Sequence, residues 1–309
     1  MIDQPVPTNI PRRHLGCQLR EIRQGAGLSI ENMARLLGRG ATTIQRLETG
    51  TASTIRMSDV EGICQFSNAE DELPRLKRLV AEIEAADDGL WHMDHDDRYE
   101  NFATYLSLEA SSTTMTQYQG VLCPGLLQTP DYARALARMS AMDPEEVELS
   151  AQVRATRQRR LTRSRDPLNL DVIIEESVLR RVVGSPALMA DQVRKLADVP
   201  ANVQLRVVPI GAPYPHSQLV AAYVILEPVG EQPVVHVEQM SGCLFYSRPE
   251  TVMEYRRAHA AAQRVALSVS DSKLLLRRIA ADHARAAAAS RTRSGSSAPG
   301  VRPAVNVTR

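Results

Sequence analysis

Histidine and carboxylate side chains are the groups of this chain that could act in acid–base chemistry or bind a metal ion. The sequence of 309 residues contains seven histidines. His92 and His95, followed by Asp96 and Asp97, have a spacing that suits metal ligands if this segment is helical. No third ligand is specified nearby, and the polar start of a helix explains these residues better. We therefore expect no bound metal.

A second group of titratable residues lies later in the chain. Glu175 and Glu176 lie near the end of the run DVIIEES at 171–177, which predicts a strand. Adjacent side chains of a strand point to opposite faces, so the two cannot act as a carboxylate pair. His216 lies in a proline-rich loop, whereas His236 and Glu238 share one face of a predicted strand. These last three residues form a candidate ligand pocket. The sequence contains no G-x-S-x-G, P-loop or G-x-G-x-x-G motif, so we expect no catalytic site and no cofactor.

The clearest local pattern is LSIENMARLLGRGATTIQRLETG at residues 28–50. It predicts two short helices joined by a tight turn. Ser29 stands at an N-cap position, and Gly38 lies where the turn needs a positive φ. The second helix begins near Ala41 and stops at Gly50, a favourable residue just beyond a helix. Apolar residues at helical spacing give both helices an inward face: Met33, Leu36, Leu37, Ile44 and Leu47.

The outward face of the second predicted helix is polar and mostly short-chained: Ala41, Thr42, Thr43, Gln45 and Arg46. Over residues 14–68, the whole pattern resembles the phage-repressor type of helix-turn-helix, the Xre-like family. The resemblance implies that this helix enters the major groove of double-stranded DNA. Ala41, Thr42 and Arg46 would then face bases, and Thr43 and Gln45 would lie nearer to phosphates.

Further candidates for contact with DNA flank this helix: Arg12, Arg13, Ser29, Arg39 and Arg56. The four arginines are expected to contact phosphates. The resemblance also implies a partly exposed ion pair between Glu48 and Arg23, which would contribute about 0–1 kcal/mol. Gly40 stands where the family usually has Ser or Thr, so the second helix lacks a side-chain cap there.

The length of the chain and the order of its predicted elements indicate two domains. Strands are expected at 113–119, 171–177, 202–209, 219–228, 233–238 and 243–247. Helix starts are expected where a capping residue or a proline precedes an apolar stripe: Ser58, Thr129, Asp143, Ser185, Pro249 and Ser270. Strands mixed with helices predict an α+β fold with a mostly antiparallel sheet behind an all-α N-terminal domain.

The predicted organisation has five parts: a flexible lead-in at 1–11, a helix-turn-helix domain at 12–68, a helical linker at 69–89, an α+β sensor or interaction domain at 90–284, and a disordered tail at 285–309. The helix expected at 74–86 could pack on the DNA-binding domain, link it to the next, or pair with its copy in a dimer. Residues 154–165 contain six arginines and no acid. Phosphate binding, an acidic partner and an exposed helix face are all compatible with that run.

The later segments also resemble a known family. CPGLLQTPDYARAL, RATRQRRL, VIIEESVLRRVVG, LRVVPIGA and VEQMSGCLFYS occur in the order found in the partner domain of a large actinobacterial-type family of Xre-like regulators. With the helix-turn-helix, this resemblance covers about residues 14–284. It implies a transcription regulator that is often encoded beside a small partner protein in an antitoxin-like arrangement. The resemblance leaves the biochemical activity of the larger domain unassigned.

Composition limits the cellular context. The formal net charge is +1, so no global basic field indicates nucleic-acid binding. The cysteines are scattered and are typical of buried thiols in a reducing cytosol: Cys17, Cys64, Cys123 and Cys243. No apolar run approaches the roughly 18 residues of a membrane helix. We expect a cytoplasmic protein without a membrane partner.

Taken together, these patterns predict a sequence-specific DNA-binding transcription regulator that acts as a homodimer on a double-stranded operator. The larger domain would serve dimerisation, ligand sensing or capture of a small partner protein. The alternative is an antitoxin-like interaction protein that sequesters a small partner and autoregulates its own operon. An enzyme is not expected.

Overall fold

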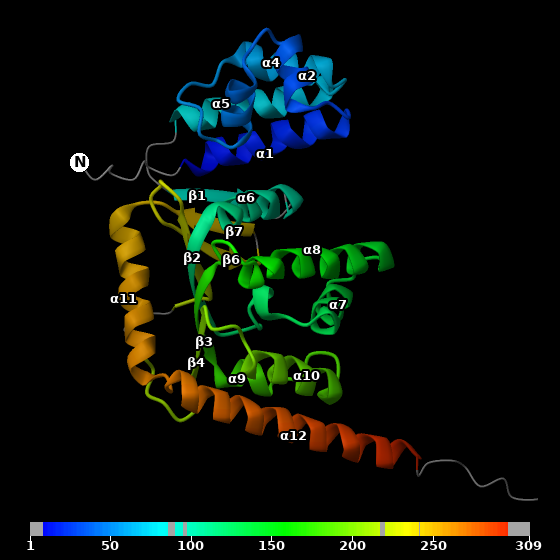
Figure 1. The fold of residues 1–309 in the computed structure, drawn as a ribbon, viewed down its shortest axis with the longest axis vertical. Coiled ribbons are helices and arrows are strands. Elements are labelled where there is room, and N and C mark those ends of the chain that lie inside the picture. The colour runs from blue at the N-terminus through cyan, green and yellow to red at the C-terminus, as the bar shows by residue number, and fades with distance from the viewer. Residues whose placement is uncertain (1–8, 86–89, 95–97, 217–219, 241, 296–309) are drawn as a thin grey trace, which may run out of the picture.

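The computed structural model describes residues 9–85, 90–94, 98–216, 220–240 and 242–295. Its N-terminal part is a bundle of helices, drawn in blue to cyan in Figure 1. The helices are α1 (Ile10–Gly25), α2 (Ile30–Leu36), α3 (Ala41–Glu48), α4 (Met57–Phe66), the short 3-10 helix η1 (Glu70–Glu72) and α5 (Leu73–Ala85). They enclose one apolar core, because each α-helix carries apolar residues at helical spacing on one face.

Helix α5 belongs to this core. Its apolar stripe is buried, and the helix lies against α1 and α4: Leu76, Leu79, Val80 and Ile83. Of the three roles compatible with a helix at 74–86, the structure places this helix on the N-terminal domain. Within the predicted helical linker at 69–89, α5 is therefore part of the N-terminal unit, because its apolar stripe is buried there.

The structure also corrects the predicted starts of two helices in this domain. Helix α1 begins at Ile10, inside the predicted lead-in at 1–11, because Asn9 Oδ1 accepts a hydrogen bond from the Arg12 amide at 3.0 Å and a proline occupies the first turn. The rest of that lead-in, residues 1–8, lies outside the described residues. Helix α4 begins after Arg56, so Ser58 lies within its first turn and is not its cap.

In the described part of the chain, seven strands form one mixed sheet in the order β1-β7-β6-β5-β2-β3-β4. The strands are β1 (Leu90–Asp94), β2 (Ser112–Gln119), β3 (Asn169–Glu175), β4 (Val203–Val208), β5 (Tyr223–Pro228), β6 (Val234–Gln239) and β7 (Gly242–Tyr246). The β2–β3 and β3–β4 pairs are parallel, and the remaining pairs are antiparallel. This confirms the predicted α+β class with a mostly antiparallel sheet. Strand β1 was not predicted.

Helices cover both faces of the sheet (Figure 1). One face packs on α6 (Arg98–Ser111), α7 (Pro130–Met139), α8 (Pro144–Thr162), α9 (Glu176–Arg180), α10 (Pro186–Ala197) and α12 (Val269–Gly295), and the other face packs on α11 (Pro249–Val265). Strand alternation divides the side chains between the two cores. Val203, Leu205 and Val207 of β4 enter the first core, whereas Val208 enters the core under α11.

Helix α12 is longer than its sequence pattern indicated. It continues to Gly295, and its C-terminal part projects beyond the body of the domain (Figure 1). The predicted disordered tail at 285–309 is therefore wrong over 285–295, where an alanine-rich segment with high helix propensity extends the helix. Residues 296–309 lie outside the described residues. The Ser268 hydroxyl, and not Ser270, caps this helix by accepting the Asp271 amide hydrogen bond at 3.1 Å.

Candidate nucleic-acid interface

The turn between α2 and α3 has the geometry that its sequence predicted. The Ser29 hydroxyl caps α2 by accepting the Asn32 amide hydrogen bond at 3.1 Å. Gly38 has φ 62°, a conformation that glycine adopts without strain, and it reverses the chain after α2. Helix α3 then starts after Gly40, where no side-chain cap forms. Gly50, with φ 72°, ends the motif.

Helix α3 presents a polar surface to solvent. Ile44 and Leu47 are buried in the N-terminal core, so the helix is fixed from its inner side. The outward side chains are exposed with the larger domain in place: Ala41, Thr42, Thr43, Gln45 and Arg46. The larger domain contacts α1 through α6, and α2 and α4 lie on the far side of α1 from it (Figure 1). Within the described residues, the Arg46 guanidinium forms no ion pair.

The flanking arginines differ in how accessible their side chains are for contact with DNA. Arg56 is exposed just before α4. Arg39 is paired with Asp59 at 2.8 Å and retains 27% of its side-chain exposure. Arg12 Nη1 donates to the carbonyl of Ala52 at 2.6 Å, which holds the loop after α3 against α1.

Arg13 does not lie on this surface. It is 4% exposed, and its guanidinium pairs with Glu231 of the larger domain. The predicted phosphate contact by Arg13 is therefore not available in this arrangement, because the docking of α1 on the larger domain buries it. Spacing along one helix could not reveal a partner 218 residues away.

The sequence analysis did not identify one set of exposed polar side chains beside α3. The loop from α3 to α4 presents Thr51, Ser53 and Thr54 to solvent. Thr51 is fixed to the end of α3 because its amide donates to the Arg46 carbonyl at 2.9 Å. The hydroxyl-rich run TASTIR was the available signal for these residues, since hydroxyls often contact phosphates.

The Arg23–Glu48 pair exists, but it is not partly exposed. Arg23 Nε and Nη2 donate to the two carboxylate oxygens of Glu48 at 2.5 and 2.7 Å, and the side chains are 6% and 2% exposed. The carboxylate raises the pKa of the Arg23 guanidinium through these hydrogen bonds. Arg20 also donates to the Glu48 carbonyl at 2.9 Å. The end of α3 is thus fixed to α1 by buried charge.

Comparison with protein families agrees with this division of the chain. Residues 102–278, more than half of the 309 residues, match the model of the domain of unknown function DUF5753. The chain belongs to the DUF5753 family. Residues 14–76 match a helix-turn-helix domain, so the N-terminal unit is a DNA-binding helix-turn-helix domain. No curated protein matches the chain significantly. None of the helices in the described ranges has both the length and the hydropathy that crossing a membrane requires.

The DUF5753 domain does not bring the predicted pocket residues together. His236 of β6 packs against Phe245 in the core on the α6 side of the sheet, with ring centroids 4.9 Å apart. His216 packs edge-on against Tyr118 at 5.3 Å, and Tyr118 belongs to the core under α11. Glu238 is exposed. The pocket prediction is wrong because the two imidazoles lie on opposite faces of the sheet.

Both imidazoles have the properties of packing residues. Burial lowers the pKa of His236 to about 4 and also lowers the pKa of His216. His92, one of the possible metal ligands, lies in strand β1 and not in a helix, and His95, Asp96 and Asp97 lie outside the described residues. No group of three or more potential metal ligands occurs within the described parts of the chain.

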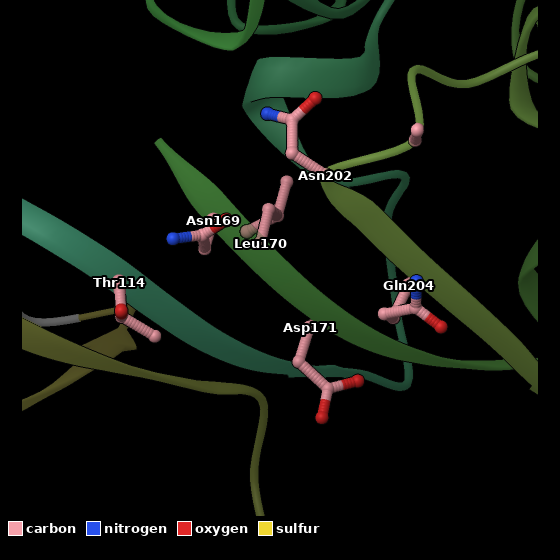
Figure 2. A pocket seen from close by; sticks show the side chains of 7 residues that line it. Thr114, Asn169, Leu170, Asp171, Asn202 and Gln204 are labelled. Carbon is pink, nitrogen blue, oxygen red and sulfur yellow. The ribbon is translucent and has the colours of Figure 1, made fainter. Parts of the chain in front are cut away.

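A hollow of about 200 Å³, lined mainly by residues of polar type, lies on strands β2, β3 and β4 of the DUF5753 domain (Figure 2). Thr114, Asp171 and Gln204 contribute to its lining. The Asp171 carboxylate already accepts hydrogen bonds from Arg206 and Gln263, each at 2.8 Å. Its acceptor capacity is thus largely satisfied inside the protein, and the hollow offers no clear charge for a ligand.

The arginine-rich run at 154–165 has a partly structural role. Arg157 donates to both carboxylate oxygens of Glu109 at 2.8 and 2.6 Å, and these side chains are 12% and 2% exposed. Arg160 donates to the backbone carbonyls of Glu109 and Ser112. These contacts join α8 to the end of α6 and to the first residue of β2. Arg154 donates to Ser150 of the same helix. Arg159, Arg163 and Arg165 are exposed, so the phosphate and acidic-partner interpretations apply only to these three residues.

Proposed function

We propose that this protein is a sequence-specific transcription regulator of the Xre-like type that binds a double-stranded DNA operator through α3. One observation carries the proposal: the outward face of α3 is exposed in the full chain, and it ends in an arginine with no ion pair among the described residues. In helix-turn-helix proteins the second helix of the motif lies in the major groove, where such side chains meet base edges.

The proposed contacts divide into two classes. Thr42 and Arg46 would supply discrimination between sequences, since an arginine can donate two hydrogen bonds to guanine. Arg56, the exposed fraction of Arg39 and the hydroxyls of the α3–α4 loop would contact phosphates. Those contacts would supply affinity that falls steeply as salt concentration rises.

Substitution of Arg46 by Ala tests the proposal. A preferred DNA sequence is first selected from a random pool with the full chain, and binding is then measured by gel-shift titration at fixed salt. We expect Arg46→Ala to weaken binding to the selected sequence by roughly 1–3 kcal/mol and to weaken binding to random DNA much less.

Arg78→Ala is the matched control, because Arg78 is an exposed arginine of the same domain on α5, a helix that packs against α1 and α4. It should leave both affinities nearly unchanged. An equal loss on all sequences with Arg46→Ala would make Arg46 a phosphate contact. Failure of the wild-type chain to select any sequence would remove the proposal.

We also propose that the regulator acts as a homodimer in the cytoplasm. Helix α3 has only eight residues, and two copies meeting half-sites about one helical turn apart would give a longer recognition site. Under this proposal the DUF5753 domain serves dimerisation, ligand sensing or capture of a small partner protein, and it is not an enzyme. A two-fold symmetric selected sequence, and a mass in solution of twice 34.1 kDa, would be expected.

A further inference from the structure

Helix α1 lies in direct backbone contact with the end of the recognition helix α3. A Cβ atom placed on Gly16 would lie 2.6 Å from the Leu47 carbonyl oxygen and 2.7 Å from that of Glu48. A Cβ atom placed on Gly50 would lie 2.6 Å from Cα of Arg13. Real Cβ contacts are not this short, so these two glycines allow the backbones to touch. A rotation of α1 must therefore move the end of α3 with it.

A neighbouring part of the α1 surface is fixed to the larger domain. Ile10, its first residue, is 2% exposed and packs in the main core of the larger domain. Three residues later, the Arg13 guanidinium binds the carboxylate of Glu231 through Nη2 and through Nε at 3.4 Å, and it donates to Ser107 Oγ of α6 at 3.2 Å. The side chains of Arg13 and Glu231 are 5% and 16% exposed.

Polar groups further along α1 continue this contact. His14 Nδ1 lies 3.1 Å from Thr104 Oγ1 of α6, and the Cys17 thiol lies 3.7 Å from the Ala103 carbonyl. Apolar surfaces can slide over one another, whereas a two-pronged guanidinium–carboxylate pair is satisfied in only one orientation. These contacts thus fix both the position and the orientation of α1 on the larger domain.

We propose that Arg13 is a positioning residue: through Glu231, in the turn between β5 and β6, it sets the orientation of α3 relative to the larger domain. This inference rests on the proposed DNA-binding function of α3. It gives the larger domain a route to that function, because a change at the β5–β6 turn would be carried through Arg13 and the backbone contact at Gly50 to α3. In this proposal Arg13 orients the two domains, whereas the sequence predicted that it would contact a phosphate.

The orientation of the two domains can be measured without DNA. Spin labels on Gln65→Cys of α4 and Met253→Cys of α11 would report the interdomain distance in the full chain, because both sites are exposed and the native cysteines are buried. We expect a single narrow distance distribution in the wild-type background. Glu231→Gln, which keeps the shape of the side chain and removes its charge, should broaden it at least twofold.

Glu227→Gln is the matched control. Glu227 lies on β5 and pairs with Arg256 at 2.8 Å, but both side chains are over one-third exposed, and no hydrogen bond or ion pair among the described residues joins either side chain to α1. Its distance distribution should match the wild type. Ser107→Ala supplies a milder variant that removes one hydrogen bond of Arg13, and it should give an intermediate width even if Glu231→Gln folds poorly. An unchanged width in both interface variants would overturn the positioning role.

DNA affinity forms the second arm of the experiment. Glu231→Gln should weaken binding to the selected sequence by about fivefold or more, the lower end of typical coupling between sites, and Glu227→Gln should not. Broadened distances with unchanged affinity would overturn the coupling to α3. If wild-type protein binds no DNA, the proposed function fails, while the distance measurement still decides whether Arg13 orients the domains.

Discussion

Removal of Glu48 is the most informative perturbation of the helix-turn-helix domain. Its carboxylate accepts two hydrogen bonds from Arg23, and the pair is almost fully buried, with 6% and 2% side-chain exposure. Glu48→Ala would leave the Arg23 guanidinium buried beside α3 with its charge unpaired. Breaking a buried pair from one side typically costs about 3–5 kcal/mol, mainly because the remaining charge stays desolvated.

That cost is large for this domain. Unfolding free energies of about 0.05–0.15 kcal/mol per residue give a unit of this size roughly 4–11 kcal/mol in total. Glu48→Ala should therefore remove roughly a quarter or more of the domain's stability and raise the fraction of unfolded N-terminal domain. Arg23 Nη1 also donates to the Leu28 carbonyl at 2.6 Å, so the loop before α2 should loosen as well.

Native-state hydrogen exchange on the full chain measures this effect domain by domain. Amides of α1 to α5 should lose about 3–5 kcal/mol of protection in Glu48→Ala, and amides of the sheet should be little affected. Glu61→Ala is the control, because Glu61 pairs with Lys77 at 2.8 Å while both side chains are nearly half exposed. It should cost about 0–1 kcal/mol. Equal losses in the two variants would refute the argument that burial, and not distance, sets the strength of the Glu48 pair.

Three further predictions concern packing, pH and phosphate contact. Gly16→Ala should destabilise the N-terminal domain by about 1–3 kcal/mol in chemical unfolding despite alanine's higher helix propensity, because its Cβ meets the carbonyls of α3; Gly25→Ala, with nothing within 4 Å, should not. Burial lowers the folded-state pKa of His236 from 6.5 to about 4, so between these pH values the imidazole is protonated in the unfolded state but neutral in the folded state. The free energy of unfolding should therefore be highest above pH 6.5 and should decrease by about 3 kcal/mol as the pH falls from 6.5 to 4. Unfolding curves at pH 7, 5.5 and 4.5 should show that His236→Phe lacks this contribution to the pH dependence. Parallel pH dependences in the wild type and in His236→Phe would contradict the lowered pKa of His236. Arg56→Ala should weaken DNA binding uniformly across sequences and reduce the salt slope by about 1 in titrations at several salt concentrations, and a sequence-dependent loss would instead make Arg56 a base contact.

The sequence was most informative where a local rule decides a local structure. Ser29, Thr129, Asp143 and Ser185 each cap the helix that their position predicted. A cap needs only a side-chain oxygen and amides two or three residues away, so short spacing contains the necessary information. The outward face of α3 could be predicted in the same way, because helical period and burial of Ile44 and Leu47 leave few other orientations.

The same reasoning could not place side chains whose partners are remote. Whether Arg13 meets a phosphate or Glu231, which is 218 residues further along the chain, depends on how α1 docks on the larger domain. The possible pocket at His216 and His236 depended on which face of the sheet each residue reaches, and strand order decides that. Spacing along the sequence reveals neither how α1 docks nor the order of the strands in the sheet.

By itself, the sequence determined the helix-turn-helix, the mixed α+β character of the larger domain and the side chains that α3 turns outward. Only the tertiary structure decided that α5 completes the N-terminal core, that β2 lies between β5 and β3, and that the Glu48 and Arg13 pairs are buried. The physical reason is that capping and periodicity act within a few residues, whereas the burial of a surface depends on which other surface covers it. Breaking an ion pair of given spacing costs little at the surface and much in a core, where the remaining charge stays desolvated, so that cost follows from the fold and not from the two residues alone.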